Sequence, residues 1–178
     1  MADAVVGESK IHGQGVFATK SFSEGETVLV LGDSRIVDEM YPLRLERGEY
    51  DYHFDYLADG KIVLMPSPER HINSCCDPNT YTKTINGLRH VVARRPIQPG
   101  DEVTYDYIID CHGGKVWQCH CGSPLCRVTV PSSFFDLPIH DQLAYLPLLN
   151  EWFAREHPKE INALKVIAEQ GCPRKGLI

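Results

Sequence analysis

Short apolar segments, separated by glycine, proline and other turn residues, run through the first two thirds of the chain. They are rich in Val, Ile and Leu and too short for typical helices, which favours β-strands. We predict strands at residues 5–8, 15–18, 27–31, 61–65, 88–94 and 101–107, and a polar loop after Asn79. Helical periodicity is weak before residue 136, so this part of the chain is predicted to be mostly β.

Aromatic and polar residues alternate along residues 50–57. A period of two predicts a strand whose aromatic side chains share one face. Tyr50, Tyr52, Phe54 and Tyr56 would then point the same way. For Phe54 and Tyr56, burial in the core of a sheet is the favoured interpretation.

The pattern changes after Asp136. Apolar residues recur there at intervals of three and four, which predicts amphipathic helices: Ile139, Leu143, Leu146, Leu149 and Phe153. Pro147 is expected to break the first helix, and a second is expected to begin at Pro158. We predict a mostly β fold with a helical C-terminus that packs over the domain or provides a contact surface, and a loose tail after Gly171.

Composition limits the class of protein. The chain has 178 residues and a net charge of −6, which suits one domain and, without a basic stripe, does not favour direct nucleic-acid binding. A cationic peptide is the more compatible partner. Without a bilayer-length apolar run or a signal-peptide pattern, a soluble, intracellular protein of the cytoplasm or nucleus, with no membrane partner, is expected.

The cysteines predict a structural metal site. Cys119, Cys121 and Cys126 lie too close in sequence for ordinary core residues and supply three ligands of a tetrahedral zinc ion. Cys76 is the favoured fourth ligand, with Cys75 and Cys111 as alternatives. The odd total of seven cysteines favours zinc over a disulfide framework.

Four motifs resemble one family. Residues 70–79, Arg-His-Ile-Asn-Ser-Cys-Cys-Asp-Pro-Asn, resemble the Arg-Phe-Ile-Asn-His-Ser-Cys-x-Pro-Asn signature of SET-domain protein lysine methyltransferases. Residues 119–127 resemble the post-SET zinc motif, and residues 11–18 and 100–107 match in the expected order. The resemblance implies several small sheets with a knot-like crossing. It divides the chain into a SET domain at 1–110, a post-SET zinc segment at 111–130 and a helical extension at 131–178.

The resemblance also implies an S-adenosylmethionine site. In the family, the loop at residues 12–15 holds this cofactor largely through main-chain groups. The implied contacts are His12, Gly13, Gln14, Gly15, Tyr50, Asn73, Ser74, Tyr107 and His120. Ser74 stands where the family has histidine, and Cys75 where it has serine.

The reaction implied is methyl transfer to the side chain of a lysine. A free lysine has a pKa of about 10.4, so the enzyme must supply a neutral amine, which an apolar aromatic slot favours. By its match to the family motif, Tyr107 is the catalytic tyrosine, Tyr105 governs how many methyl groups are added, and Tyr52 begins the lysine channel. A tyrosine at position 105 narrows the slot, which predicts mono- or dimethylation rather than trimethylation.

Two alternatives remain. One is a catalytically silent SET-like zinc module that binds a partner, which the unusual Ser74 and Cys75 suggest; the other is a zinc hydrolase, ranked lower because no open His/Glu site is evident. The expected partner is a basic protein or peptide with an exposed lysine, with histones, ribosomal proteins and other peptides all open. The apolar faces of the C-terminal helices leave dimer formation open.

Overall fold

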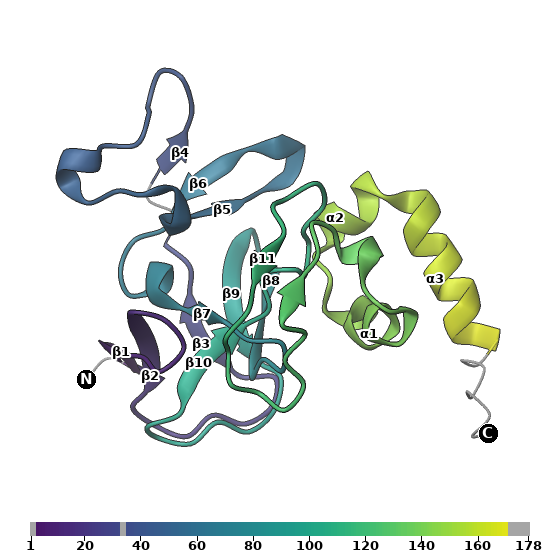
Figure 1. The fold of residues 1–178 in the computed structure, drawn as a ribbon, viewed down its shortest axis with the longest axis horizontal. Helices are drawn as coiled ribbons and strands as arrows, with labels where there is room; N and C mark the ends of the chain where they lie inside the picture. Colours follow the sequence, from purple (N-terminus) through teal and green to yellow (C-terminus); the bar gives the residue numbers. More distant parts are fainter. Residues whose placement is uncertain (1–2, 33–34, 171–178) are drawn as a thin grey trace.

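The computed structural model describes residues 3–32 and 35–170, and within them the strands form small separate sheets (Figure 1). One sheet has the order β1-β2-β10-β7: β1 (Ala4–Glu8), β2 (Gln14–Ala18), β10 (Glu102–Tyr105) and β7 (Asn73–Ser74). β1 and β2 form the predicted antiparallel hairpin. β7 pairs with β10 in parallel, which places the Asn73 segment beside the strand that leads to Tyr107.

A second sheet has the order β3-β9-β8: β3 (Thr27–Val30), β9 (Leu88–Ala93) and β8 (Thr80–Ile85). The loop predicted after Asn79 is wrong, because β8 runs antiparallel to β9 from Thr80 onward. Asn86 and Gly87 join the two strands with φ of 51° and 79°. Asn-Gly with two positive φ angles is typical of a tight hairpin turn. This dipeptide therefore indicated β8, although the polar residues of the strand favoured a loop.

A third sheet has the order β4-β6-β5: β4 (Arg35–Val37), β6 (Ile62–Leu64) and β5 (Phe54–Tyr56). The strand predicted for 50–57 is therefore wrong at its start, where residues 51–53 form a 3-10 turn. The Tyr50 carbonyl accepts the His53 N–H at 2.9 Å, and the Tyr50 N–H donates to His53 Nδ1 at 3.3 Å, which closes the turn. Burial of Tyr56 is also wrong, since its side chain is 52% exposed.

The C-terminal region contains a two-stranded sheet and three α-helices: β11 (Trp117–Gln118), β12 (Thr129–Val130), α1 (Ile139–Tyr145), α2 (Glu151–Glu156) and α3 (Pro158–Gln170). Pro147 lies in a 3-10 turn between α1 and α2, as predicted. The helices gather on the side of the molecule away from β1 and β2 (Figure 1). The tail after residue 171 lies outside the described residues. No helix within the described ranges is long and apolar enough to cross a membrane.

Six 3-10 turns complete the described structure: η1 (Leu45–Arg47), η2 (Asp51–His53), η3 (Ala58–Gly60), η4 (Glu69–His71), η5 (Phe134–Asp136) and η6 (Leu146–Leu148).

Apolar side chains gather in two cores. The first joins β1, β2, β3, β9 and β10 through Val16, Val91 and Val103, which are fully buried. The second joins the cysteine-rich segment to the helices, and it contains Ile108 and Phe153. The helical extension therefore packs on the segment that follows Tyr107, and the predicted fold of small sheets with C-terminal helices is confirmed. The knot-like crossing stays a prediction.

Candidate active site

A cavity of about 1070 Å³ lies between the sheets and the C-terminal region. It brings together ten of the residues predicted for the cofactor and lysine sites: His12, Gly13, Gln14, Tyr50, Tyr52, Asn73, Ser74, Tyr105, Tyr107 and His120. Gly15 does not line the cavity. Segments that are far apart in sequence therefore share one site, as the motifs predict.

The amide of Asn73 holds the glycine loop in place. Its Nδ2 lies 3.2 Å from the His12 carbonyl and 2.9 Å from the Gln14 carbonyl, and it also reaches the Ser9 hydroxyl at 3.0 Å and Glu102 Oε1 at 2.8 Å. An amide nitrogen has only two protons, so these four acceptors share them. The side-chain nitrogen of Asn73 is thus committed to the protein, and its role is to shape the loop.

Gly15 has a packing role in the same network. A Cβ at this position would overlap the Glu102 carboxylate. That carboxylate cannot move aside cheaply, because it accepts hydrogen bonds from Ser9 and Asn73. Glycine is therefore required here for close approach to Glu102, and contact of Gly15 with a cofactor stays a prediction.

Tyr107 is fixed against the Asn73 segment. Its hydroxyl donates to the Ile72 carbonyl at 2.7 Å, and its N–H donates to the Ser74 hydroxyl at 3.2 Å. Ser74 therefore has a structural contact with the predicted catalytic residue. The rings of Tyr105 and Tyr107 lie 5.1 Å apart, so two phenols face the same part of the cavity.

Both phenols stay protonated at neutral pH. Burial raises the pKa of Tyr105 and of Tyr107 above the ordinary value, and the negative charge of Asp55 raises each further. Tyr107 keeps 43% exposure because its ring lines the cavity. The Tyr107 proton is given to the Ile72 carbonyl, so the Tyr107 oxygen can act toward a ligand as a hydrogen-bond acceptor, while the ring faces accept a cation.

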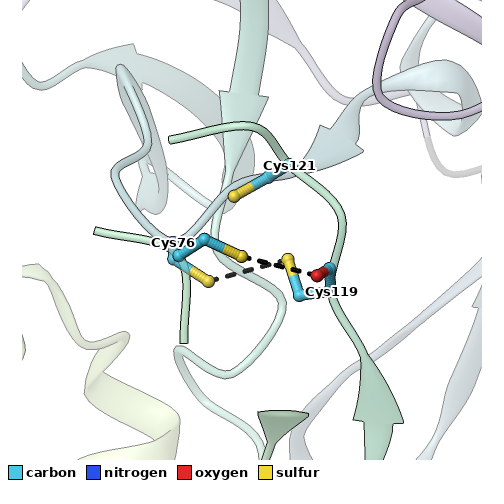
Figure 2. Close-up of side chains that lie close together, drawn as sticks. Cys76, Cys119 and Cys121 are labelled. Atoms are coloured by element: carbon cyan, nitrogen blue, oxygen red, sulfur yellow. Dashed lines mark hydrogen bonds between the residues drawn. The ribbon is translucent and has the colours of Figure 1, made fainter. Parts of the chain in front are cut away.

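Four cysteine thiols meet beside the cavity. The Sγ atoms of Cys76, Cys119, Cys121 and Cys126 all lie within 4.8 Å of one another, and Figure 2 shows the first three pointing together. Cys76 and Cys119 are 3.6 Å apart. Four sulfurs around one zinc ion at about 2.3 Å stand roughly 3.8 Å apart, so these residues could hold the metal. The group contains Cys76 rather than Cys75 or Cys111, as predicted.

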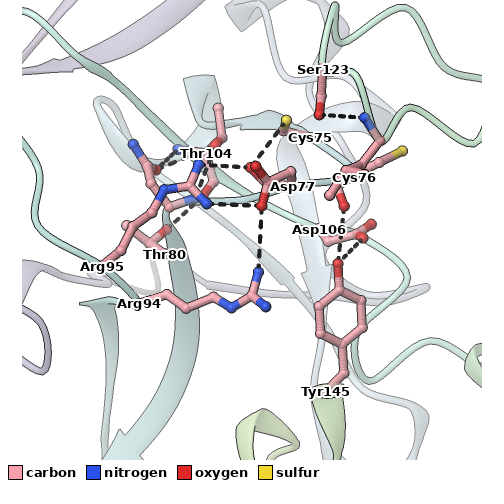
Figure 3. A network of polar contacts seen from close by, with 12 residues as sticks. Cys75, Cys76, Asp77, Thr80, Arg94, Arg95, Thr104, Asp106, Ser123 and Tyr145 are labelled. Atoms are coloured by element: carbon pink, nitrogen blue, oxygen red, sulfur yellow. Dashed lines mark hydrogen bonds and ion pairs between the residues drawn. The ribbon is translucent and has the colours of Figure 1, made fainter. Parts of the chain in front are cut away.

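A buried ion pair connects this group to the end of β10 and to α1. Arg127 donates to Asp106 Oδ2 at 2.6 Å, and the backbone N–H of Arg127 donates to Cys76 Sγ at 3.4 Å. The Tyr145 hydroxyl reaches Asp106 at 3.0 Å and the Cys76 carbonyl at 3.2 Å (Figure 3). Three segments thus converge on the buried carboxylate next to Tyr107.

Comparison with known proteins decides the family. A family model described as "SET domain" matches residues 13–108. The chain belongs to the SET-domain family. The match contains β2 to β10, Cys76 and Tyr107, and it ends before Cys119, Cys121, Cys126 and the helices.

Individual relatives agree with this assignment. The chain is 35% identical over 130 residues to the histone-lysine N-methyltransferase trithorax of Drosophila melanogaster, with 67% of this chain and 3% of that protein covered. It is 31% identical to the histone-lysine N-methyltransferase TRX1 of rice, with 70% and 13% covered. It is 30% identical to the human histone-lysine N-methyltransferase SETD1A, with 68% and 8% covered. The chain therefore spans only a small part of each.

Among solved structures, one titled as a histone methyltransferase of Plasmodium falciparum superposes on this chain with a TM-score of 0.48 and 19% sequence identity. The superposition covers 60% of this chain and 94% of the other.

Two histidines of this SET domain line the cavity and were not predicted. Burial lowers the pKa of His53 and of His71, and the charge of Arg70 lowers both further, so both rings are neutral at pH 7. Tyr50 and Tyr52 stack beside them with centroids 5.2 Å apart. The signal for His71 was present in the sequence, since it stands where the SET signature has phenylalanine. His53 carried no such signal.

The cavity is also lined by acidic side chains that were not predicted from the sequence. Asp55 accepts a hydrogen bond from Arg89 at 2.6 Å, which joins β5 to β9. Asp110, three residues after Tyr107, accepts from the backbone N–H of Asn150 at 2.9 Å and from its Nδ2 at 2.6 Å. Burial raises the pKa of Asp110 to about 7 against these hydrogen bonds. Asp110, Asn150 and Trp152 all line the cavity.

Proposed function

We propose that the protein is an S-adenosylmethionine-dependent protein-lysine N-methyltransferase. The observation that carries this proposal is that one cavity contains both the loop shaped by Asn73 and the paired phenols of Tyr105 and Tyr107. The relatives named histone-lysine N-methyltransferases support the reaction class. Ligand pockets commonly measure about 300–1000 Å³, so a cavity at the top of this range has room for a cofactor and a lysine side chain.

The residues present fit the cofactor. The main chain of residues 12–14 offers polar groups at one end, with Ser74, Tyr50 and His120 nearby, and all of these line the cavity. When bound, S-adenosylmethionine supplies a methyl group on a sulfonium. The protein's part is to hold the acceptor amine in line with that group, because displacement requires collinear donor and acceptor.

The tyrosines prepare the amine. An aromatic, partly desolvated slot lowers the pKa of an entering lysine and favours the neutral form. The hydroxyl oxygens of Tyr105 and Tyr107 then direct the amine by accepting hydrogen bonds from its N–H groups, which leaves its lone pair free, and the ring faces accept the positive charge of the methylated product. Tyr107 can do this without moving, because its hydroxyl is already fixed by the Ile72 carbonyl.

We also propose that zinc is bound by Cys76, Cys119, Cys121 and Cys126. Four thiolates leave no open position, so such a zinc is structural. Burial disfavours ionisation of Cys121, but the backbone N–H groups of Cys76 and Ser123 outweigh it and lower the pKa to about 7. The metal would fix residues 119–126 to the segment after Asn73, which forms one wall of the cavity.

The test is transfer of a labelled methyl group. Purified protein is incubated with S-adenosylmethionine carrying a tritiated methyl group and with histones, ribosomal proteins and synthetic lysine peptides. We expect label on lysine, and a fall of about 100-fold in kcat for Tyr107→Phe, since one positioned hydroxyl is removed. Tyr81→Phe on β8 is the matched control, because it removes a hydroxyl away from the cavity.

A calorimetric measurement of cofactor binding separates the alternatives. Cofactor binding without methyl transfer to any substrate supports the silent interaction module. The absence of both cofactor binding and methyl transfer rejects the S-adenosylmethionine site altogether.

Tyr105 is expected to limit the number of methyl groups that the product lysine carries. We expect mono- and dimethyllysine from the wild type, and a shift toward higher methylation for Tyr105→Phe, because losing the hydroxyl widens the slot. Mass spectrometry of the peptide product measures this. Mostly trimethyllysine from the wild type contradicts the reasoning.

Several expectations stay proposals. They are the division of the chain at residues 110 and 130, a basic protein substrate such as a histone, a dimer through the C-terminal helices, and location in the cytoplasm or nucleus.

A further inference from the structure

The helical extension contributes directly to the cavity, beyond its packing role. Asn150 and Trp152 line the same cavity as Tyr105 and Tyr107, although they lie outside the segment that matches the SET domain. Asn150 immediately precedes α2 and is 7% exposed, and Trp152 lies in the first turn of that helix and is half-buried. The extension therefore supplies part of the surface that a substrate would meet.

Asn150 connects this wall to two other elements. Its backbone N–H and its Nδ2 donate to the two oxygens of Asp110. The same Nδ2 reaches the Thr82 hydroxyl at 3.2 Å, and its Oδ1 accepts from the Thr84 hydroxyl at 3.4 Å. One buried amide thus fixes the start of α2, strand β8 and the segment after Tyr107 relative to one another.

Asp110 is held in an unusual state. Its φ is 62°, a left-handed conformation that is uncommon for residues other than glycine. Such a conformation persists where the surroundings impose it, and it often marks a functional site. A carboxylate has about four lone-pair positions, and Asn150 uses two of them, so Asp110 retains capacity for another donor.

The other charged side chains that line the cavity leave room for a cation at Asp110. Asp55 already offsets the charge of Arg89, and Arg70 lies beside His71, with its Nε 3.4 Å from His71 Nε2. Lys115 also borders the cavity, but it is exposed, so water screens its charge. The indole of Trp152 provides the aromatic face that attracts a guanidinium or ammonium group best.

We propose that Asp110 and Trp152 form a subsite for a basic residue that flanks the target lysine of the substrate, with Asn150 as the positioning residue. The subsite rests on the proposed methyltransferase function and adds the substrate class to it: peptides in which lysine has an arginine or lysine neighbour. The half-buried carboxyl group of Asp110 binds the cation, and the indole of Trp152 packs against it.

The test is a positional scan of synthetic peptides. Each peptide contains one central lysine, and each flanking position is in turn arginine, glutamine or glutamate. For the wild type we expect at least one position at which arginine raises kcat/KM about tenfold over glutamine, the size expected for a partly desolvated cation contact. Asp110→Asn and Trp152→Ala reduce this ratio to near one, and Trp152→Phe retains most of it.

Two controls separate the subsite from loss of folding. Val166→Ala changes an exposed residue of α3 that does not line the cavity, and it leaves the ratio unchanged. The ratio compares two peptides on the same protein, so a general loss of active enzyme cancels. A wild type with no arginine preference at any position, or variants that retain it, overturns the subsite.

Binding of fluorescein-labelled arginine and glutamine peptides, measured by fluorescence anisotropy, keeps this test independent of catalysis. If no methyl group is transferred but the arginine peptide binds about tenfold more tightly and Asp110→Asn abolishes the difference, the subsite stands and the proposed reaction falls. If transfer occurs without any arginine preference in rate or binding, the reaction stands and the subsite falls.

Discussion

Removing Arg127 should destabilise the protein strongly, because its partner cannot reach water. The Asp106 side chain is 0% exposed and the Arg127 side chain 13%, with 2.6 Å between Nη1 and Oδ2. Breaking a buried pair by removing one partner costs about 3–5 kcal/mol. The Tyr145 hydroxyl remains as a donor to the same carboxylate, so we expect the lower end, about 3 kcal/mol, for Arg127→Met.

A matched exposed pair provides the control. Arg95 and Asp77 are 2.8 Å apart, a similar distance, but their side chains are 46% and 34% exposed, and Arg94 gives Asp77 a second partner. Exposed pairs contribute about 0–1 kcal/mol, so Arg95→Met should change the free energy of unfolding by less than about 1 kcal/mol.

Urea unfolding of the metal-loaded protein, followed by tryptophan fluorescence, measures both variants. In thermal unfolding, about 3 kcal/mol corresponds to a fall in Tm of roughly 6–12 °C for a chain of this size. Arg127→Met/Asp106→Asn should recover part of the loss, because the uncompensated charge is then gone. If Arg127→Met costs no more than Arg95→Met, or if the double variant is the least stable, the buried-charge reasoning is wrong.

Three further predictions concern pH, metal and the β8–β9 turn. The pKa of Asp110 is about 7 when folded and about 3.9 when unfolded, so the folded state retains a proton that the unfolded chain has released; its contribution to stability is complete below about pH 3.9 and is lost by about pH 7. The wild type should therefore lose more stability than Asp110→Asn between about pH 5 and pH 7.5 in urea titrations, and parallel curves would exclude this. Mass spectrometry of the native protein should find zinc lost after treatment with 1,10-phenanthroline and in Cys121→Ser but retained in Cys111→Ser, which changes a cysteine outside the group. Gly87→Ala should lower the free energy of unfolding by about 1–2 kcal/mol, because alanine is disfavoured at a φ of 79°. No atom of the described chain beyond the adjacent residues lies within 4 Å of the added Cβ, so the backbone conformation alone causes this loss, and equal stability of the variant and wild type in urea would count against the turn geometry.

The strands that the sequence predicts correctly are those whose signal is local. The apolar segments at 27–31 and 61–65 form β3 and β6 because branched side chains suit a buried strand. β8 was missed because its residues are largely polar, and only the Asn86-Gly87 turn indicated it. In residues 50–57 the alternation of aromatic and polar residues correctly indicated the strand β5. At the start of the segment, the hydrogen bond from the Tyr50 N–H to His53 Nδ1 favours a turn instead.

The sequence predicted those residues of the candidate site that belong to recognisable motifs, and it did not predict contacts between segments that are remote in sequence. Cys76 was favoured over Cys75 and Cys111 as the fourth thiol, and the Sγ atoms of the four cysteines meet as expected. The ion pair between Asp55 and Arg89 joins strands that are remote in sequence, and no periodicity reports such a pairing. The same holds for Asn150 and Asp110, since only the packing of α2 against the domain brings them together.

The separation of the thiols along the chain orders events during synthesis. Cys76 emerges 43 residues before Cys119, and the β8–β9 hairpin and β10 are made in the interval. Under the proposed zinc site, the first ligand therefore waits as a lone thiol until the last three arrive together. A nascent chain that stops before residue 119 has neither the metal nor the wall that contains His120. Under the proposed function, unfinished chains are thus expected to be unable to methylate a substrate, and activity would arise only after the final cysteine of the group has left the ribosome.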